Sequence, residues 1–150
     1  MKELVKQLLK TNPNIGLSIA RWTLGLVIFP HGAQKLLGLF GGYGYSATIE
    51  SLTTQMDLPI VVAFSVIMIE FFGSISLILG LFSRFWALAL AVMFFGIIVT
   101  TQFEHGFFMN WYGDQTGEGF EYSLLVIGIA LSIVVNGSGK WSIDGLISKK

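Results

Sequence analysis

The sequence contains no cysteine among its 150 residues. Disulfides, Cys-ligated iron–sulfur or zinc sites and thiol redox catalysis are therefore excluded. Charged residues are also scarce, at 12% of the chain, where a soluble domain carries about a quarter. The net charge is zero, which gives no electrostatic reason to expect nucleic acid or an acidic partner. Any redox role must therefore use a bound cofactor or a redox-active substrate.

In place of charge, the chain carries long apolar runs. Apolar residues make up 53% of the sequence, and the mean hydropathy is +0.72. A membrane-spanning helix needs about 20 apolar residues, with a range near 17–25. Four apolar segments approach that length, at about residues 15–39, 58–82, 85–103 and 120–135. We therefore expect an all-α, polytopic membrane protein whose single domain, residues 1–150, is a bundle of four transmembrane helices.

The distribution of lysine and arginine predicts the orientation of this bundle in the lipid membrane. Apart from those within the first apolar segment, the lysines and arginines fall in three places. They precede the first segment, follow the fourth, or, in the case of Arg84, lie between the second and third. The other two loops, about residues 40–57 and 104–119, contain acidic residues but no Lys or Arg. Because positive charge is retained in the cytoplasm, we expect both termini and Arg84 to be cytoplasmic and the two acidic loops to face outward.

Four ionisable residues lie inside the first two apolar segments, where a charge is costly. Arg21, His31 and Lys35 belong to the first segment, and Glu70 lies near the middle of the second. A charge that faces lipid costs roughly 2.5–3.5 kcal/mol even on mild insertion scales, so such residues face a bundle interior or a wet cavity. We therefore take Glu70 as the leading candidate for a functional site.

Helical phase predicts which faces of the helices meet. At about 100° per residue, small and polar residues fall on one stripe of each segment. The stripes are Ser18, Arg21, Gly25, Ile28, Gly32, Lys35 and Leu39; Ala63, Val66, Glu70, Gly73, Ser74, Leu77, Leu81 and Arg84; the weaker Ala89, Gly96, Thr100 and Phe103; and Glu121, Leu125, Gly128, Ser132 and Val135. Small residues let helix backbones approach, so we expect these stripes to face the interior. They also allow self-association, so a homodimer stays open.

Depth along the helices indicates which ionisable groups can pair. At about 1.5 Å rise per residue, His31 and Glu70 lie at similar levels, so we expect a buried His31–Glu70 pair. Lys35 and Glu121 both lie near the outer end, where they can pair with each other. Arg21 lies nearer the cytoplasmic side, where it either reaches toward Glu70 or extends to the interface.

Histidine is too rare and too scattered to predict a haem or metal site. The two histidines, His31 and His105, differ in depth by roughly 10 Å, which disfavours bis-His haem ligation. The acidic residues of the bundle lack the Glu-x-x-His spacing of di-iron proteins. We therefore expect no metal. His105 follows Glu104 at the outer edge of the bundle and stays a candidate ligand contact there.

A set of short motifs follows in order along the chain. They are Arg21-x3-Gly25, His31-Gly32-x2-Lys35, Glu70-x2-Gly73, Gly80-Leu81-x2-Arg84, Glu121 at the start of the fourth segment, and Gly137-x-Gly139-x-Trp141-Ser142-x-Asp144. Over about residues 15–145, this set resembles the DoxX family of small prokaryotic membrane proteins. The resemblance implies a multi-pass protein of the plasma (inner) membrane, associated with quinone-linked oxidoreductases, oxidative stress, or quinone and catechol detoxification.

We expect the chain to bind a quinone or small aromatic molecule within the bundle, as a membrane subunit of a quinone-linked oxidoreductase. In this hypothesis Glu70 relays protons, and His31 with Lys35 or Arg21 donates hydrogen bonds to the ligand. Glu121 and His105 are further candidate contacts. Because the sequence shows no electron carrier, a redox partner protein would supply electrons, and whether this chain itself is catalytic stays open. The alternatives are a non-catalytic membrane anchor or assembly partner of an enzyme, and a small transporter.

Overall fold

The structure is a computed structural model and describes residues 7–148. Within that range every regular element is helical and no strand is present, so the predicted all-α class is confirmed for this part of the chain. Lys2, Lys6, Lys149 and Lys150, which contributed to the predicted orientation, lie outside the described residues.

The first long helix, α2, spans Ile15–Leu37, against the predicted 15–39. Its start is fixed by Asn14, whose Oδ1 accepts a hydrogen bond of 2.7 Å from the backbone N–H of Gly16. Its end is fixed by Gly38, which adopts the left-handed conformation (φ 71°) that glycine enters without steric cost.

The second apolar segment forms one continuous helical rod in three parts. α4 spans Ile60–Met68, η1 is a π-helical turn over Ile69–Gly73, and α5 spans Ser74–Leu79. The rod lies within the predicted 58–82 and ends at Gly80, which is again left-handed. A π turn widens one turn of helix by a residue and is found frequently at functional sites.

The third and fourth apolar segments form a pair of long helices. The third consists of α6 (Ser83–Ile97), a second π turn η2 (Ile98–Gln102) and a short 3₁₀ turn η3 (Phe103–His105), and the fourth is α7 (Glu121–Asn136). The predicted segments were 85–103 and 120–135. The first long loop contains helix α3 (Gly44–Thr54), and a short helix α8 (Ile143–Ile147) lies near the end of the chain.

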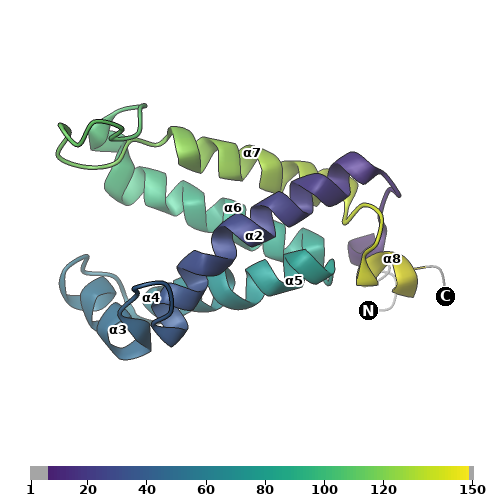
Figure 1. The fold of residues 1–150 in the computed structure, drawn as a ribbon, viewed down its shortest axis with the longest axis horizontal. Helices are drawn as coiled ribbons and strands as arrows, with labels where there is room; N and C mark the ends of the chain where they lie inside the picture. Colours follow the sequence, from purple (N-terminus) through teal and green to yellow (C-terminus); the bar gives the residue numbers. More distant parts are fainter. Residues whose placement is uncertain (1–6, 149–150) are drawn as a thin grey trace.

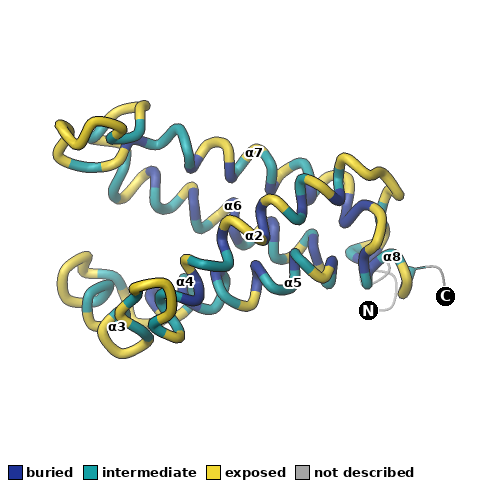
Figure 2. Tube along the Cα trace, viewed as in Figure 1, coloured by how far each residue is buried: buried dark blue, intermediate teal, exposed yellow. Residues whose placement is uncertain are grey.

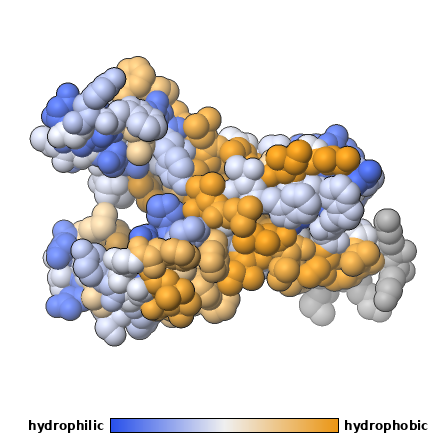
Figure 3. Space-filling view, in the orientation of Figure 1, coloured by the Kyte–Doolittle hydropathy of each residue, from blue (hydrophilic) through white to orange (hydrophobic). Residues whose placement is uncertain are grey.

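Figure 1 shows α6 and α7 side by side, with α2 crossing them. α2 also packs against η1 and α5, which closes the bundle at the end where α8 lies; we call this the tail end. At the opposite end, the loop end, the helices diverge into two lobes. One lobe contains α3 and α4, and the other contains η2, η3, residues 106–120 and the start of α7. The space-filling view shows a notch between the lobes, with hydrophilic side chains near its root (Figure 3).

The predicted inward face is correct for α2 and wrong for α7. The buried residues of α2 are Ser18, Arg21, Leu24, Gly25, Ile28, Gly32 and Ala33. Those of α7 are Ser123, Val126, Ala130 and Ile133, which face α6. Leu125 and Val135 of the predicted α7 stripe are instead 67% and 71% exposed. Because α7 is apolar on all sides, small residues such as Gly128 do not single out its packing face.

The predicted stripe of α6 is also wrong. Its buried residues are Ser83, Ala87, Leu90, Ala91 and Phe94. Thr100 is exposed, and Phe103 is 70% exposed. Ala89 and Gly96 line a surface groove rather than the interior. Figure 2 shows this alternation of buried and exposed positions along α6.

Two helices of the described residues are long and apolar enough to cross a membrane. They are Ile60–Leu79 and Ser83–His105, with mean hydropathies of 2.2 and 1.9. α7 is apolar but shorter, and α2 is long enough but carries Arg21, His31 and Lys35. Figure 3 shows apolar side chains across the middle of the molecule and hydrophilic ones gathered at the loop end.

Candidate functional site

Lys35 of α2 and Glu70 of η1 form an ion pair where α2 packs against the π turn. The distance between Lys35 Nζ and Glu70 Oε2 is 2.5 Å, and the two side chains are 28% and 6% exposed. Two predicted pairings are therefore wrong: Glu70 does not pair with His31, and Lys35 does not pair with Glu121. The structure does bring together the two residues that the sequence placed on the inward stripes of their helices.

His31 lies on the outer surface of α2 and is exposed. Gly32, the next residue, is buried against η1, and consecutive residues of a helix point about 100° apart. Among the described residues, no hydrogen bond or ion pair involves the His31 ring. The prediction relied on depth alone and ignored this difference in face, so His31 is not part of the Glu70 site.

Glycine at position 32 allows α2 to approach the π turn closely. A Cβ atom at Gly32 would lie 2.5 Å from the backbone N of Phe71 and 2.6 Å from the carbonyl carbon of Glu70. Backbone atoms cannot yield as a flexible side chain can, so a larger residue would push the helices apart. Gly32 thus holds the Glu70 segment within reach of Lys35, one turn further along α2.

The ion pair leaves hydrogen-bonding capacity unused. A lysine ammonium carries three N–H donors, and within the described chain only Glu70 accepts from Lys35. Glu70 accepts that bond through Oε2. Its other oxygen, Oε1, accepts no hydrogen bond within the described chain and is not fully buried, so it is open to a ligand. The pair can therefore donate to one oxygen of a ligand and accept from another.

Tyr122 of α7 adds a polar group that sequence reasoning missed. Its hydroxyl is buried and has no hydrogen-bond partner within the described residues, which costs roughly 1–3 kcal/mol. The ring packs edge-on against Phe94 of α6, with 6.0 Å between centroids. A tyrosine at the start of a helix gives no sequence signal for this placement, which depends on how α7 packs.

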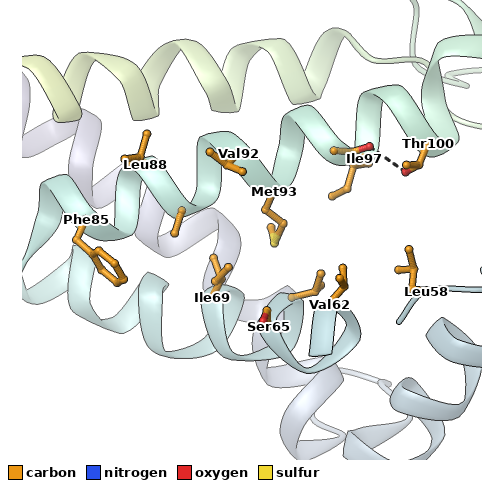
Figure 4. A pocket seen from close by; sticks show the side chains of 13 residues that line it. Leu58, Val62, Ser65, Ile69, Phe85, Leu88, Val92, Met93, Ile97 and Thr100 are labelled. Atoms are coloured by element: carbon orange, nitrogen blue, oxygen red, sulfur yellow. Dashed lines mark hydrogen bonds between the residues drawn. The ribbon is translucent and has the colours of Figure 1, made fainter. Parts of the chain in front are cut away.

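The described chain contains two further hollows, of which one has a residue of the pair in its wall. A pocket of about 280 Å³ between the end of α2 and α3 has Lys35 in its wall. Its other lining residues are Gln34, Gly41, Gly42, Tyr43, Ala47, Thr48, Ser51 and Leu52. A larger, apolar groove of about 440 Å³ lies between α4 and α6 (Figure 4). Within residues 7–148, no cluster of three or more His, Asp or Glu side chains could hold a metal ion.

Comparison with known proteins gives a match to the profile of the DoxX family over residues 16–102, more than half of the chain. The chain belongs to the DoxX family. This confirms the family expected from the ordered motifs, and the chain is accordingly a membrane protein. The matched range contains Lys35, Glu70 and both π turns, so the candidate site lies within the part that defines the family.

A curated relative from Bacillus subtilis (strain 168) carries the name "Putative oxidoreductase CatD". It is 27% identical to this DoxX chain over 135 residues, which are 90% of this chain and 89% of CatD. The similarity therefore extends beyond the family match to most of both proteins. No solved structure matches the chain.

Arg21 of this DoxX protein makes its hydrogen bonds at the tail end of the bundle. Its side chain is fully buried (0% exposed), and its guanidinium donates hydrogen bonds to five backbone carbonyls. The acceptors are Leu77, Ile78, Ser138, Lys140 and Trp141. Arg21 thus ties α2 and the end of α5 to the segment before α8. The predicted contact with Glu70 is wrong, because Glu70 bonds to Lys35 instead. The predicted extension of Arg21 to the membrane interface stays a prediction.

Asp144 completes this tail-end cluster. Its carboxylate accepts hydrogen bonds from the backbone N–H groups of Phe82 and Ser83, at 2.7 and 3.0 Å, and from the Ser138 hydroxyl at 2.5 Å. The N–H groups at the start of a helix lack partners within the helix, so Asp144 caps α6 from a distant part of the chain. The cluster is a structural tie between the helices and the tail.

Glu121 lies in the lobe opposite Lys35 and orders residues 106–120. Its Oε1 accepts hydrogen bonds from the Met109 backbone N–H and the Trp111 indole N–H, both at 2.9 Å. These bonds explain why Glu121 does not form the predicted pair with Lys35. Its predicted contact with a ligand stays a prediction.

His105 belongs to the same lobe. Its Nδ1 lies 3.2 Å from the Thr116 hydroxyl, and its Nε2 lies 3.6 Å from Oε1 of the exposed Glu104. The ring also packs against Gly117, where an added Cβ would lie 2.3 Å from Nε2. These contacts place His105 as a support of the loop, and its predicted role as a ligand contact stays a prediction.

Proposed function

We propose that this DoxX protein is a membrane subunit of a quinone-linked oxidoreductase or quinone stress-response system, and that Lys35 and Glu70 form the polar end of its ligand site. The observation that carries this proposal is a partly buried ion pair, built on a π turn, with hydrogen-bonding capacity left over. An ion pair that served stability alone would be better placed with its remaining donors and acceptors satisfied.

The chemistry of a quinone fits these groups. A quinone carbonyl accepts hydrogen bonds, and its reduction to a quinol requires protons at the same oxygens. Lys35 supplies donors for a carbonyl, and Glu70 accepts or delivers a proton beside it. The electrons come from a redox partner protein that docks on this chain. The printed name "Putative oxidoreductase CatD" supports this class of reaction for a relative of similar length.

The same proposal includes the arrangement in the membrane. α2, the rod from α4 to α5, α6 and α7 each cross a prokaryotic plasma membrane, with the tail end in the cytoplasm. Two of these four are long and apolar enough to span by composition alone. The remaining support comes from the charges: Lys10, Arg84 and Lys140 gather at the tail end, through bonds from Arg84 to the Lys10 carbonyl and from Arg21 to the Lys140 carbonyl.

A second candidate function is a non-catalytic membrane anchor for an enzyme. The observation that favours it is that the guanidinium groups of Arg21 and Arg84 donate their hydrogen bonds to backbone carbonyls within the chain. In this alternative Lys35 and Glu70 are one more internal tie, and no ligand enters the bundle.

The test replaces both members of the pair at once. Removing only Glu70 would leave the partly buried Lys35 charge without its partner and lower the stability, which confuses stability with binding. The double variant Lys35→Met/Glu70→Met leaves no stranded charge and should keep its thermal stability in detergent. Quinones are extracted from gently purified protein, and menaquinone and ubiquinone analogues are then titrated. The matched control is Glu50→Gln, an exposed carboxylate on α3.

We expect wild type and the Glu50→Gln control to bind a quinone, and the double variant to remain folded but lose the binding by at least about tenfold, or ~1.4 kcal/mol. A stable double variant that binds as wild type does would contradict the proposed site. A wild type with neither bound quinone nor affinity for added quinone would favour the anchor function.

A further inference from the structure

The pocket between the end of α2 and α3 shares a residue with the ion pair, because Lys35 lies in its wall. Figure 1 shows α3 beside the end of α2, at the loop end of the bundle. The volume of this pocket, about 280 Å³, is near the lower limit of ligand pockets, which is roughly 300 Å³. The pocket is therefore of a size for a small single-ring molecule, and such a molecule would contact Lys35.

Close packing of the loop that follows α2 fixes one side of the pocket. A Cβ atom at Gly42 would lie 2.4 Å from both the Cα and the carbonyl oxygen of Gln34, so only glycine lets the loop approach this closely. The Gln34 side chain also donates from Nε2 to the carbonyl of Phe40 at 3.0 Å. These two contacts hold the loop against α2 beside Lys35, so this wall of the pocket is preformed.

The α3 wall carries a hydroxyl that its own helix does not use. Thr53 and Thr54, which lie outside the pocket, donate to carbonyls of the preceding turn at 2.8 and 2.6 Å. Thr48 lies in the wall, and within the described chain its hydroxyl makes no hydrogen bond. A hydroxyl supplies one donor and two acceptor lone pairs. The Thr48 hydroxyl is therefore available to a molecule in the pocket.

The charges around the pocket favour a neutral ligand. The positive charge of Lys35 is matched by the Glu70 carboxylate, 2.5 Å away. Glu50 on α3 is exposed, and residues 40–57 contain no lysine or arginine. An anion thus gains no net attraction here. A neutral molecule with an oxygen acceptor can still bind the N–H donors that Lys35 keeps.

The pocket lies on the part of the molecule that meets water in the proposed arrangement. Tyr43 in its wall is 88% exposed, and no residue of α3 is buried. Hydrophilic side chains gather at this loop end (Figure 3). Because the loop end faces outward in the proposed arrangement, a ligand reaches the pocket from the outer aqueous phase.

We propose that this pocket binds a small, neutral, tailless quinone from the outer aqueous phase, with Lys35 and Thr48 donating hydrogen bonds to its two carbonyls. A para-quinone carries its oxygens on opposite edges of the ring, and the two donors belong to the α2 and α3 walls. This inference rests on the proposed function and narrows its ligand. Thr48 becomes a residue that determines specificity, and a lipid-borne quinone is disfavoured because its tail has no place in the pocket.

The experiment removes the Thr48 hydroxyl and keeps the shape of the side chain. Thr48→Val makes this change in the wall, and Thr54→Val makes the same change on α3 outside the pocket. Ala47→Leu fills the pocket by a second route. The full chain of each variant, in lipid nanodiscs, is titrated by isothermal calorimetry with the tailless ubiquinone ring and with benzoate, an anionic single ring. The titration with the tailless ring is repeated in the presence of decylubiquinone as a competitor.

We expect wild type and Thr54→Val to bind the tailless ring equally well. Thr48→Val should bind it about three- to tenfold more weakly, which corresponds to one lost hydrogen bond. Ala47→Leu should weaken the binding in the same direction by removing space for the ring. Benzoate should bind to wild type at least about tenfold more weakly than the neutral ring, and decylubiquinone, held in lipid by its tail, should not compete.

Four results would overturn the inference. Unchanged ring binding in both Thr48→Val and Ala47→Leu, with loss in Lys35→Met/Glu70→Met, would place the ring elsewhere beside the pair and leave the proposed function intact. Competition by decylubiquinone, or binding of decylubiquinone alone, would assign the ligand to the lipid phase and also leave that function intact. Benzoate binding as tight as that of the neutral ring would make the pocket an anion site. No binding of either quinone by wild type would remove both the inference and the proposed function.

Discussion

At the scale of single residues, the charged side chains within the bundle fall into two kinds. Arg21 and Asp144 use their hydrogen-bonding groups on partners inside the chain and join the helices to the tail. Lys35 and Glu70 bond to each other and keep capacity in reserve. The first kind explains how the tail end is closed, and the second marks the place where a ligand can be recognised.

Replacing Arg21 by lysine should destabilise the protein without affecting ligand binding. Lysine keeps the charge but has fewer donors and no planar fork, so some of the carbonyls that Arg21 holds would be left buried and unpaired. The expected loss is about 2–4 kcal/mol of the free energy of unfolding. It is measured as a lower thermal midpoint in detergent, with quinone affinity measured on the folded protein at low temperature.

Arg84→Lys is the matched control for this prediction. Arg84 also donates to backbone carbonyls, those of Lys10, Val134 and Val135, but it is only partly buried. Water can replace some of its bonds, so the loss of stability should be smaller. If Arg21→Lys were as stable as wild type but bound quinone less well, Arg21 would belong to the ligand site after all.

The sequence was sufficient to select Glu70, Lys35 and Arg21 as inward-facing residues, because a charge in an apolar helix has few other places to go. It was not sufficient to pair them. Helical phase gives the face of a residue, and rise gives its approximate depth, but a contact also depends on helix tilt and on how closely two backbones approach. His31 matched Glu70 in predicted depth and failed on face, whereas Lys35 lies on the correct face but was placed nearer the outer end by helical rise alone.

At the scale of helices, the π turn η1 sets the geometry of the site. The buried positions of the rod run Ala63, Ile67, Glu70, Gly73, Ser74 and Leu77. Both Glu70 and Gly73 lie inside the widened turn, where Glu70 contacts α2 through Lys35 and Gly73 packs against Trp86 of α6. Nothing in the apolar sequence around Glu70 signals a π turn.

Gly32→Ala should damage this packing, whereas Gly128→Ala should not. A Cβ at Gly32 would overlap the backbone of Phe71, and such overpacking costs about 1–3 kcal/mol. Gly128 has open space, so alanine there should stabilise the helix by about 0.5–1 kcal/mol. Thermal unfolding of both variants in one detergent measures the difference. Similar midpoints for the two would mean that α2 and η1 do not approach as closely as the structure has them.

The stripe predictions for α6 and α7 were wrong for a reason that belongs to membrane helices. In water, the buried face of a helix is the apolar one. A helix surrounded by lipid is apolar on both faces, so only polar or small residues carry a signal, and small residues also occur where nothing packs. Gly96 and Gly128 are of that second sort. α2 was predicted correctly because Ser18, Arg21 and Lys35 mark its inward face.

At the scale of the whole molecule, the two ends differ in charge and in how closely their helices pack. The tail end gathers basic residues and is tied by Arg21, Arg84 and Asp144. The loop end is acidic and divides into two lobes around a notch (Figure 3). In the proposed function, the Lys35–Glu70 pair receives the ligand, and the redox partner protein docks on the chain.

The arrangement across the membrane can be tested with a single set of variants, because the chain has no cysteine of its own. Tyr43→Cys and Tyr112→Cys lie in the two loops of the loop end, at positions 88% and 92% exposed, and Lys140→Cys lies at the tail end. With four crossings and a cytoplasmic tail end, a membrane-impermeant maleimide should label the two tyrosine positions on intact cells and position 140 only after permeabilisation. Labelling of position 112 but not 43 would mean that α2 and the rod from α4 to α5 do not both cross. Labelling of position 140 on intact cells, with 43 and 112 protected, would reverse the orientation and place the Lys35 pocket on the cytoplasmic side.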